Sequence, residues 1–175
     1  VVHTRDSMDD AVGIVEEMIA QNEYWMSQQA TSSSRFLAPK GVFHCYSGDT
    51  QTAWRLFKLG FLVSYPGIVT FKNSPAAETL KSIGYDHVML ETDSPYLTPA
   101  PHRGKRNEPV HIPEIGKRIA EICGATLEDV ARTTTYNAQR LFNIDTLGAP
   151  VFTYALGRSL YINLTIRCNA DCVFC

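Results

Sequence analysis

The sequence predicts an α/β fold in which parallel strands alternate with helices. Short apolar runs rich in β-branched and aromatic residues, such as GVFHCY at 41–46 and FLVSYPG at 61–67, are separated by stretches with apolar residues at helical spacing. Gly and Pro stand at the turns between them. Continuously apolar strands separated by helices are typical of a parallel sheet covered by helices, either a doubly wound sheet or part of an eightfold barrel.

The first part of the chain predicts a strand, a helix and a loop. VVHTRD opens on a strand, and a helix follows over 6–19 with Asp6 or Ser7 as its N-cap. The apolar face of this helix is formed by Val12, Val15, Met18 and Ile19. Residues 27–40 are Ser-rich and polar, which indicates a loop before the strand at 41–46.

The middle of the chain repeats the alternation. A helix is expected over 49–60, with Asp49 as its cap and Gly60 at its end, and its apolar face is Ala53, Leu56 and Phe57. A second helix over 74–84 starts at Ser74, and the buried strand HVMLET (87–92) follows it. A Pro-rich loop over 93–109 then leads into the last two helices.

Those last two helices are expected over 111–124 and 126–142. Three consecutive threonines lie at 133–135 in the second of them. Because threonine is a poor helix former, this helix is expected to break in its middle.

Composition excludes some functional classes. The chain has 175 residues, of which 45% are hydrophobic and 19% charged, as in ordinary globular proteins. The net charge of -2 gives no global basic field, so a polyanion would have to be bound by local arginines or by bound cations. There is no apolar run of membrane-spanning length and no signal-peptide pattern, so no membrane contact and a cytoplasmic location are expected.

Three residues with metal-binding side chains lie at or just past the carboxyl ends of predicted strands. They are His3, His44 and Asp93. Taken alone, each histidine is more often a hydrogen-bonded core residue. Their common position favours a metal site assembled from several strands, and it favours a barrel over a doubly wound sheet, because barrels collect functional residues at that end.

Three arginines beside these segments are candidates for binding phosphate. A guanidinium group donates two parallel hydrogen bonds to phosphate oxygens. The residues are Arg5, Arg103 and Arg106. Two alternatives stay open: the loop is a solvated charged segment, or Arg103 pairs with Glu91 or Glu108. Glu91 is equally a candidate for holding a ligand in place. No metal role is expected for His87, His102 and His111.

Six segments resemble, in this order and spacing, the second half of TatD-family metal-dependent hydrolases: VVHTRD, GVFHCYSG, SYPGIVTFKN, LETDSPYLTP, PHRGKRNEP and TTYNAQRLF. The resemblance covers residues 1–143. It implies a (β/α)8 TIM barrel and hydrolysis of phosphodiesters, commonly DNA, with divalent Mg, Mn or Zn ions. It also implies that His3, His44 and Asp93 are metal ligands, and that Asp93 acts in catalysis by orienting or deprotonating the attacking water.

The same resemblance implies residues that this sequence does not contain. The family has a pair of histidines on the first barrel strand and a bridging glutamate, whereas this chain opens on the later HTR strand. We therefore expect a barrel truncated at its N-terminus, with half of its metal site and little or no nuclease activity from these residues alone. An exposed sheet edge would favour aggregation or pairing with another copy, so the oligomeric state is open.

The end of the chain predicts a second domain. Residues 144–158 contain Gly148, Pro150 and Gly157 and indicate a linker, and an apolar strand begins at 159. Within 159–175, three cysteines have the spacing CxxxCxxC: Cys168, Cys172 and Cys175. Five cysteines, three of them clustered, suit a reducing compartment and thiolate-bound metal better than disulfides.

The CxxxCxxC segment resembles the entry motif of radical S-adenosylmethionine (radical SAM) enzymes. It implies a [4Fe-4S] cluster with one iron left open for S-adenosylmethionine. A zinc knuckle would need a fourth ligand that the sequence lacks, and three structural thiols are the remaining alternative. The functional hypotheses are thus a metal-dependent phosphodiesterase fused to a radical SAM domain of unknown substrate, a protein whose main activity is that of the radical SAM enzyme, and an inactive fragment. The first accounts for most of the residues.

Overall fold

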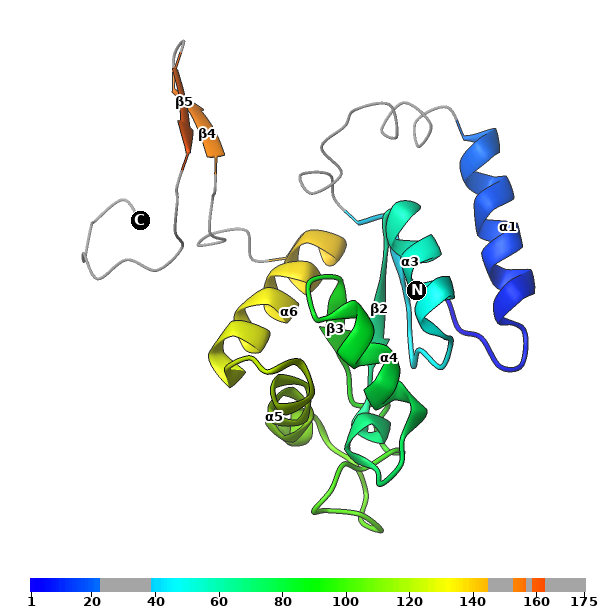
Figure 1. The fold of residues 1–175 in the computed structure, drawn as a ribbon, viewed down its shortest axis with the longest axis vertical. Coiled ribbons are helices and arrows are strands. Elements are labelled where there is room, and N and C mark those ends of the chain that lie inside the picture. The colour runs from blue at the N-terminus through cyan, green and yellow to red at the C-terminus, as the bar shows by residue number, and fades with distance from the viewer. Residues whose placement is uncertain (23–38, 145–152, 157–158, 163–175) are drawn as a thin grey trace.

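The computed structural model describes residues 1–22, 39–144, 153–156 and 159–162 (Figure 1). Helices and strands alternate along the chain, as the sequence predicts. In chain order they are α1 (Met8–Gln21), β1 (Gly41–Phe43), α3 (Thr50–Lys58), β2 (Phe61–Tyr65), η1 (Gly67–Thr70), α4 (Pro75–Ile83), β3 (Val88–Leu90), η2 (Pro109–His111), α5 (Ile112–Cys123), α6 (Leu127–Phe142), β4 (Thr153–Leu156) and β5 (Ser159–Ile162).

Strands β1, β2 and β3 form a parallel sheet in that order. Val42 pairs with Leu62, and Val63 pairs with Val88. The strand predicted at the start of the chain is reduced to a single parallel bridge between Val2 and Phe43. There the Val2 amide donates to the Val42 carbonyl at 2.8 Å, and the His44 amide donates to the Val2 carbonyl at 3.0 Å. The N-terminal segment is therefore fastened beside β1.

The two faces of the sheet pack against largely different helices, although α6 also contributes Val130 to the first of the two cores. One face carries Phe43, Phe61, Val63, Tyr65 and Val88, which share a core with α1, α3, α4 and α5. The opposite face carries Val42, Leu62 and Met89, which pack against Ala138 and Leu141 of α6. Figure 1 shows α1 and α6 on opposite sides of the strands. This alternation follows from the two-residue period of a strand.

Helix ends agree with the capping residues in the sequence, with two exceptions. Asp49 caps α3, where its side chain accepts a hydrogen bond from the Thr52 amide at 2.8 Å. Gly60 and Gly84, after α3 and α4, have φ values of 86° and 70° that favour glycine. Ser7 precedes α1 and Ser74 precedes α4, but neither side chain makes a capping hydrogen bond.

Two expectations about the helices are wrong. Met18 does not belong to the buried face of α1: it is 54% exposed, because it lies about 120° around the helix from the buried Val12. Helix α6 does not break at its threonines. The buried Thr134 hydroxyl donates to the Val130 carbonyl at 2.9 Å, so its polar group is satisfied inside a continuous helix.

A buried amide fastens α6 to the sheet. The Asn137 side chain donates to the Asp86 and Val88 carbonyls, both at 2.9 Å. These bonds and the packing of α6 on the sheet outweigh the low helix propensity of the threonines.

The loop that follows β3 passes close to the end of β2. A Cβ atom at Gly67 would lie 1.9 Å from the Leu97 carbonyl oxygen, so only glycine permits this approach. The Ala100 amide donates to the Thr70 hydroxyl at 2.9 Å, and the buried Thr98 hydroxyl donates to the Lys105 carbonyl at 2.6 Å. The loop is therefore fastened both to η1 and to itself.

Strands β4 and β5 form an antiparallel pair. Strand β4 lies within the predicted linker 144–158, and β5 lies at the start of the predicted second domain. Cys168, Cys172 and Cys175 lie outside the described residues, so the predicted domain division and iron-sulfur site stay predictions. In the described part of the chain, no helix combines the length and the apolar character needed to span a membrane.

Candidate metal centre at the carboxyl end of the sheet

Glu91 connects the ends of two strands that are not neighbours. It follows β3, and His44 follows β1, with β2 between them. Glu91 Oε2 lies 3.1 Å from His44 Nδ1, and Glu91 Oε1 accepts a hydrogen bond from the Cys45 amide at 2.6 Å. His44 and Glu91 come two residues after Val42 and Met89, so this contact lies on the face of the sheet that also carries those two side chains.

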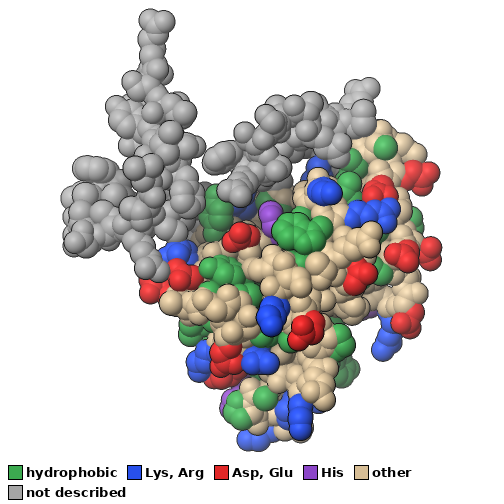
Figure 2. Space-filling model, viewed as in Figure 1, with side chains coloured by type: hydrophobic (Ala, Val, Ile, Leu, Met, Phe, Trp, Pro, Cys, Tyr) green, Lys and Arg blue, Asp and Glu red, His purple; other side chains and the backbone are tan. Residues whose placement is uncertain are grey.

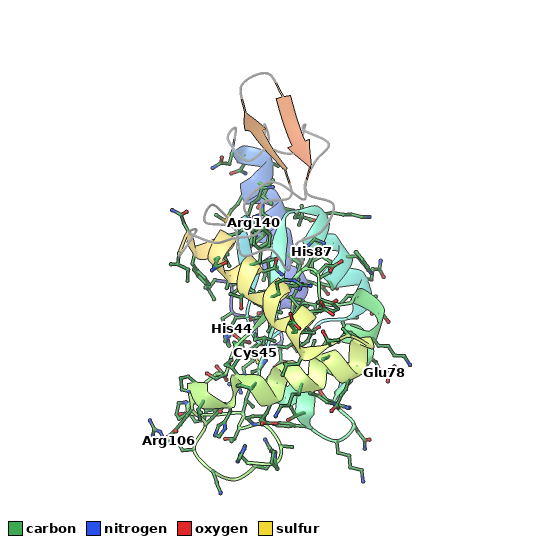
Figure 3. The ribbon with its side chains drawn as sticks, turned by 90° about the vertical axis from the view of Figure 1, so that its left-hand side faces the viewer. His44, Cys45, Glu78, His87, Arg106 and Arg140 are labelled. Atoms are coloured by element: carbon green, nitrogen blue, oxygen red, sulfur yellow. The ribbon has the colours of Figure 1, made fainter. Side chains whose placement is uncertain are left out.

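His3 extends this connection toward solvent. Its Nδ1 lies 2.7 Å from His44 Nε2, and the two rings are 4.9 Å apart between centroids. The bridge between Val2 and Phe43 brings the two histidines together. His3 is exposed, whereas His44 and Glu91 are only about a fifth exposed. Figure 3 shows His44 and Cys45 side by side within the molecule, while Arg106 lies at its periphery.

The carboxylate fixes the protonation pattern of neutral His44. An ionised carboxylate only accepts hydrogen bonds, so the neutral imidazole carries its proton on Nδ1 and donates it to Glu91. Nε2 then has a free lone pair, which accepts a hydrogen bond from His3 Nδ1. A metal-binding histidine needs one ring N–H donated to a carboxylate in this way, so that the other nitrogen is unprotonated.

Asp93 follows β3 two residues after Glu91, but its carboxylate makes no hydrogen bond or ion pair with His3 or His44. Its φ is 55°, in the left-handed region that a non-glycine residue rarely adopts. Burial, together with the charges of Glu91 and Asp93, raises the pKa of the neighbouring Cys45 thiol to about 11. With its pKa raised in this way, Cys45 is a neutral thiol near pH 7.

The structure brings together two of the three predicted metal ligands. His3 and His44 converge, and their imidazole nitrogens suit a divalent cation such as zinc or manganese. Across residues 1–22, 39–144 and the two short strands, no group of three or more His, Cys, Asp or Glu side chains is placed to hold a metal ion. The donor type therefore fits a cation, but the number of donors falls short, and the three-ligand set stays a prediction.

The arginines occupy different environments. The Arg103 guanidinium carbon lies 3.6 Å from the centre of the Phe71 ring, and Nη1 donates to the Thr98 carbonyl at 3.3 Å. Neither Glu91 nor Glu108 is thus its partner. Arg5 and Arg106 are exposed, and their side chains make no hydrogen bond or ion pair with the described residues. Lys and Arg side chains are visible at the lower end of the molecule in Figure 2, where the 93–109 loop lies in Figure 1.

Three histidines without a predicted metal role have ring partners. His87 stacks on Phe57 at 4.6 Å, and His102 stacks on His111 at 4.4 Å. Asn107 had no expected role from the sequence, and it is almost fully buried in a loop of charged residues. The available signal was the tendency of asparagine to hydrogen-bond the backbone of turns.

The substitution Glu91→Gln should reverse the tautomer of His44. The introduced side chain can keep its oxygen on the Cys45 amide, which places its NH2 group against His44 Nδ1. His44 would then carry its proton on Nε2. The 15N chemical shifts of the imidazole ring report this directly: we expect a protonated Nδ1 in the parent protein and a protonated Nε2 in the variant, with the resonances of His87 unchanged. The same His44 tautomer in both proteins would contradict the role assigned to Glu91.

Comparison with known proteins places this chain in a family. A model of TatD-related DNases matches residues 1–143. The uncharacterized metal-dependent hydrolase YcfH of Escherichia coli K12 is 38% identical over 146 residues, which cover 83% of this chain and 49% of that protein. YabD of Bacillus subtilis, also named an uncharacterized metal-dependent hydrolase, is 38% identical and covered to 51%. The chain spans about half the length of these curated relatives.

Solved structures show the same fold. YJJV, a TatD homologue from Escherichia coli, superposes with a TM-score of 0.66 at 21% identity, over 82% of this chain and 49% of that one. An uncharacterized amidohydrolase from Saccharomyces cerevisiae superposes with a TM-score of 0.60 at 18% identity, over 80% and 52% of the two chains. The parallel sheet with its helices is thus a TatD-like α/β fold, and the chain belongs to the family of TatD-related DNases.

Proposed function

We propose that this chain supplies part of the active site of a metal-dependent phosphodiesterase that acts on DNA. The observation that carries this proposal is the hydrogen-bonded series from Glu91 through His44 to His3 at the carboxyl end of the parallel sheet. In this proposal β1, β2 and β3 are strands of a (β/α)8 barrel, whose functional residues gather at that end. The names of the relatives, metal-dependent hydrolases of the TatD family, support it.

Each residue has a distinct task in this proposal. His3 and His44 would hold a divalent cation, and Glu91 keeps the His44 lone pair available for it. Such a cation lowers the pKa of bound water and neutralises charge on phosphate oxygens. Asp93 would act as a further ligand and accept the proton of the attacking water. Arg5, Arg103 and Arg106 would bind phosphate groups.

The number of donors limits what the described residues can do alone. Catalytic zinc sites use three protein ligands, whereas only two imidazole nitrogens converge in the described part of the chain. Further ligands, from another segment or another chain, would therefore be needed for full turnover. Binding of substrate is consequently a sharper test of this chain than cleavage.

Binding of single-stranded DNA should depend on both a cation and the arginines. We expect a fluorescently labelled single-stranded oligonucleotide to bind more tightly with Mn²⁺ than with a chelator, and Arg106→Ala to weaken binding by about threefold or more. Lys81→Ala is the matched control, since it removes an exposed cation from α4. Fluorescence anisotropy at fixed ionic strength measures both effects. Equal affinity with Mn²⁺ and with chelator, or equal losses in the two variants, would refute the proposed substrate class.

We also propose that residues 159–175 begin a radical SAM domain. This second proposal rests on the CxxxCxxC spacing of Cys168, Cys172 and Cys175 alone. The family match ends at residue 143 and does not include these cysteines. The radical SAM domain adds a second activity to the hydrolase, with S-adenosylmethionine bound at a [4Fe-4S] cluster.

The iron content of the chain tests this second proposal. After anaerobic reconstitution with iron and sulfide, mass spectrometry should find iron in the parent chain and none in a variant with all three cysteines replaced by alanine. A matched variant in which Cys45 and Cys123 are replaced instead should keep its iron. Absence of iron from the parent chain would eliminate the cluster.

A further inference from the structure

Asn107 holds the turn that carries Asp93 from both sides. Its side-chain NH2 group donates to the Thr92 carbonyl at 2.7 Å and to the Tyr96 carbonyl at 2.6 Å. Thr92 immediately precedes Asp93, and Tyr96 closes the turn through its amide, which donates to the Asp93 carbonyl at 2.9 Å. One side chain thus fixes both flanks of Asp93.

The side-chain oxygen and the backbone amide of Asn107 also have partners. Its Oδ1 accepts a hydrogen bond from the Glu108 amide at 2.9 Å, and its own amide donates to the Pro95 carbonyl at 3.1 Å. Only an amide side chain has two donors and one acceptor within this reach. Asn107 is 1% exposed, so water cannot replace these partners.

The turn needs such support because its backbone is strained. Asp93 has φ 55° and Leu97 has φ 52°, both in the left-handed region. Non-glycine residues stay in this region only where the surrounding structure holds them there, and they cluster at functional sites. The exposed Ser94, Pro95 and Tyr96 provide little packing of their own.

We propose that Asn107 is a positioning residue, whose amide sets the conformation of the turn 92–96 and so directs the Asp93 carboxylate toward the cation held by His3 and His44. The part of this inference that concerns the cation rests on the proposed function. The part that concerns the turn rests on the hydrogen bonds alone. This assigns a task to the asparagine of the RNEP segment (106–109).

The substitution Asn107→Asp tests the inference with little change of shape. The aspartate keeps the acceptor for the Glu108 amide and loses both donors to Thr92 and Tyr96. Asn137→Asp is a matched control. Asn137 is another buried amide that donates to two carbonyls, Asp86 and Val88, around the opposite end of β3.

Amide hydrogen exchange of the full chain is the first measurement. In Asn107→Asp we expect exchange of the Tyr96 amide to accelerate by about tenfold or more relative to the amides of β2, because the turn loses two hydrogen bonds. In Asn137→Asp the Tyr96 amide should keep its rate relative to β2. Unchanged exchange at Tyr96 in Asn107→Asp, or equal acceleration in both variants, would overturn the inference.

Calorimetric titration with Mn²⁺ is the second measurement. We expect Asn107→Asp to weaken Mn²⁺ binding by about tenfold, as loss of a group that orients a ligand commonly does, and Asn137→Asp to leave it unchanged. Equal Mn²⁺ affinities of the parent chain and Asn107→Asp would overturn the link to the cation. A parent chain that binds no Mn²⁺ would refute the proposed function and with it the link to the cation, while the exchange rates would still decide the role of Asn107 in the turn.

Discussion

The Glu91 carboxylate is the interaction on which the candidate site depends. It joins the residues that follow β1 to those that follow β3, with its two oxygens on His44 and on the Cys45 amide. Because a carboxylate only accepts, it determines which nitrogen of His44 is protonated and thus which lone pair is available. Replacing Glu91 by an apolar residue would leave the Cys45 amide without this partner and the His44 ring without a fixed orientation.

His44 and Glu91 meet only because the register of β1, β2 and β3 brings the ends of β1 and β3 to the same edge of the sheet. The core of α1, α3, α4 and α5, joined by Val130 of α6, packs on one face, and Ala138 and Leu141 of α6 pack on the other. Two buried asparagines fasten the ends of β3, with Asn137 at the start of the strand and Asn107 at the turn beyond its end. The core is therefore supplemented by amide side chains where the backbone departs from regular structure.

The elements were predictable from the sequence because each has a strong local signal. Apolar spacing, Asp49 as a cap, and Gly60 and Gly84 as helix ends agree with the structure. The continuous α6 was not predictable, since the local preference of its threonines opposes the packing and the Asn137 bonds that stabilise it.

The candidate site was predictable only in part. The approach of His3 to His44 follows from the bridge between the N-terminal segment and β1. From the sequence, Glu91 could either pair with Arg103 or hold a metal ligand in place. No sequence pattern indicated whether Glu91 or Glu108 would face Arg103. The structure shows that Arg103 packs on Phe71 instead, a contact between segments that are distant in the sequence. The role of Asn107 likewise depends on a loop that folds back on itself.

We propose that His3 and His44 form a cation site at the carboxyl end of the sheet. Paramagnetic broadening of NMR signals by Mn²⁺ would locate the bound cation. In NMR spectra of the chain with substoichiometric Mn²⁺, we expect the signals of His3, His44 and Cys45 to broaden first, followed by those of Asp93. Broadening that begins instead at the acidic start of α1, at Asp9 and Asp10, would contradict a cation site at His3 and His44. So would the absence of any selective broadening.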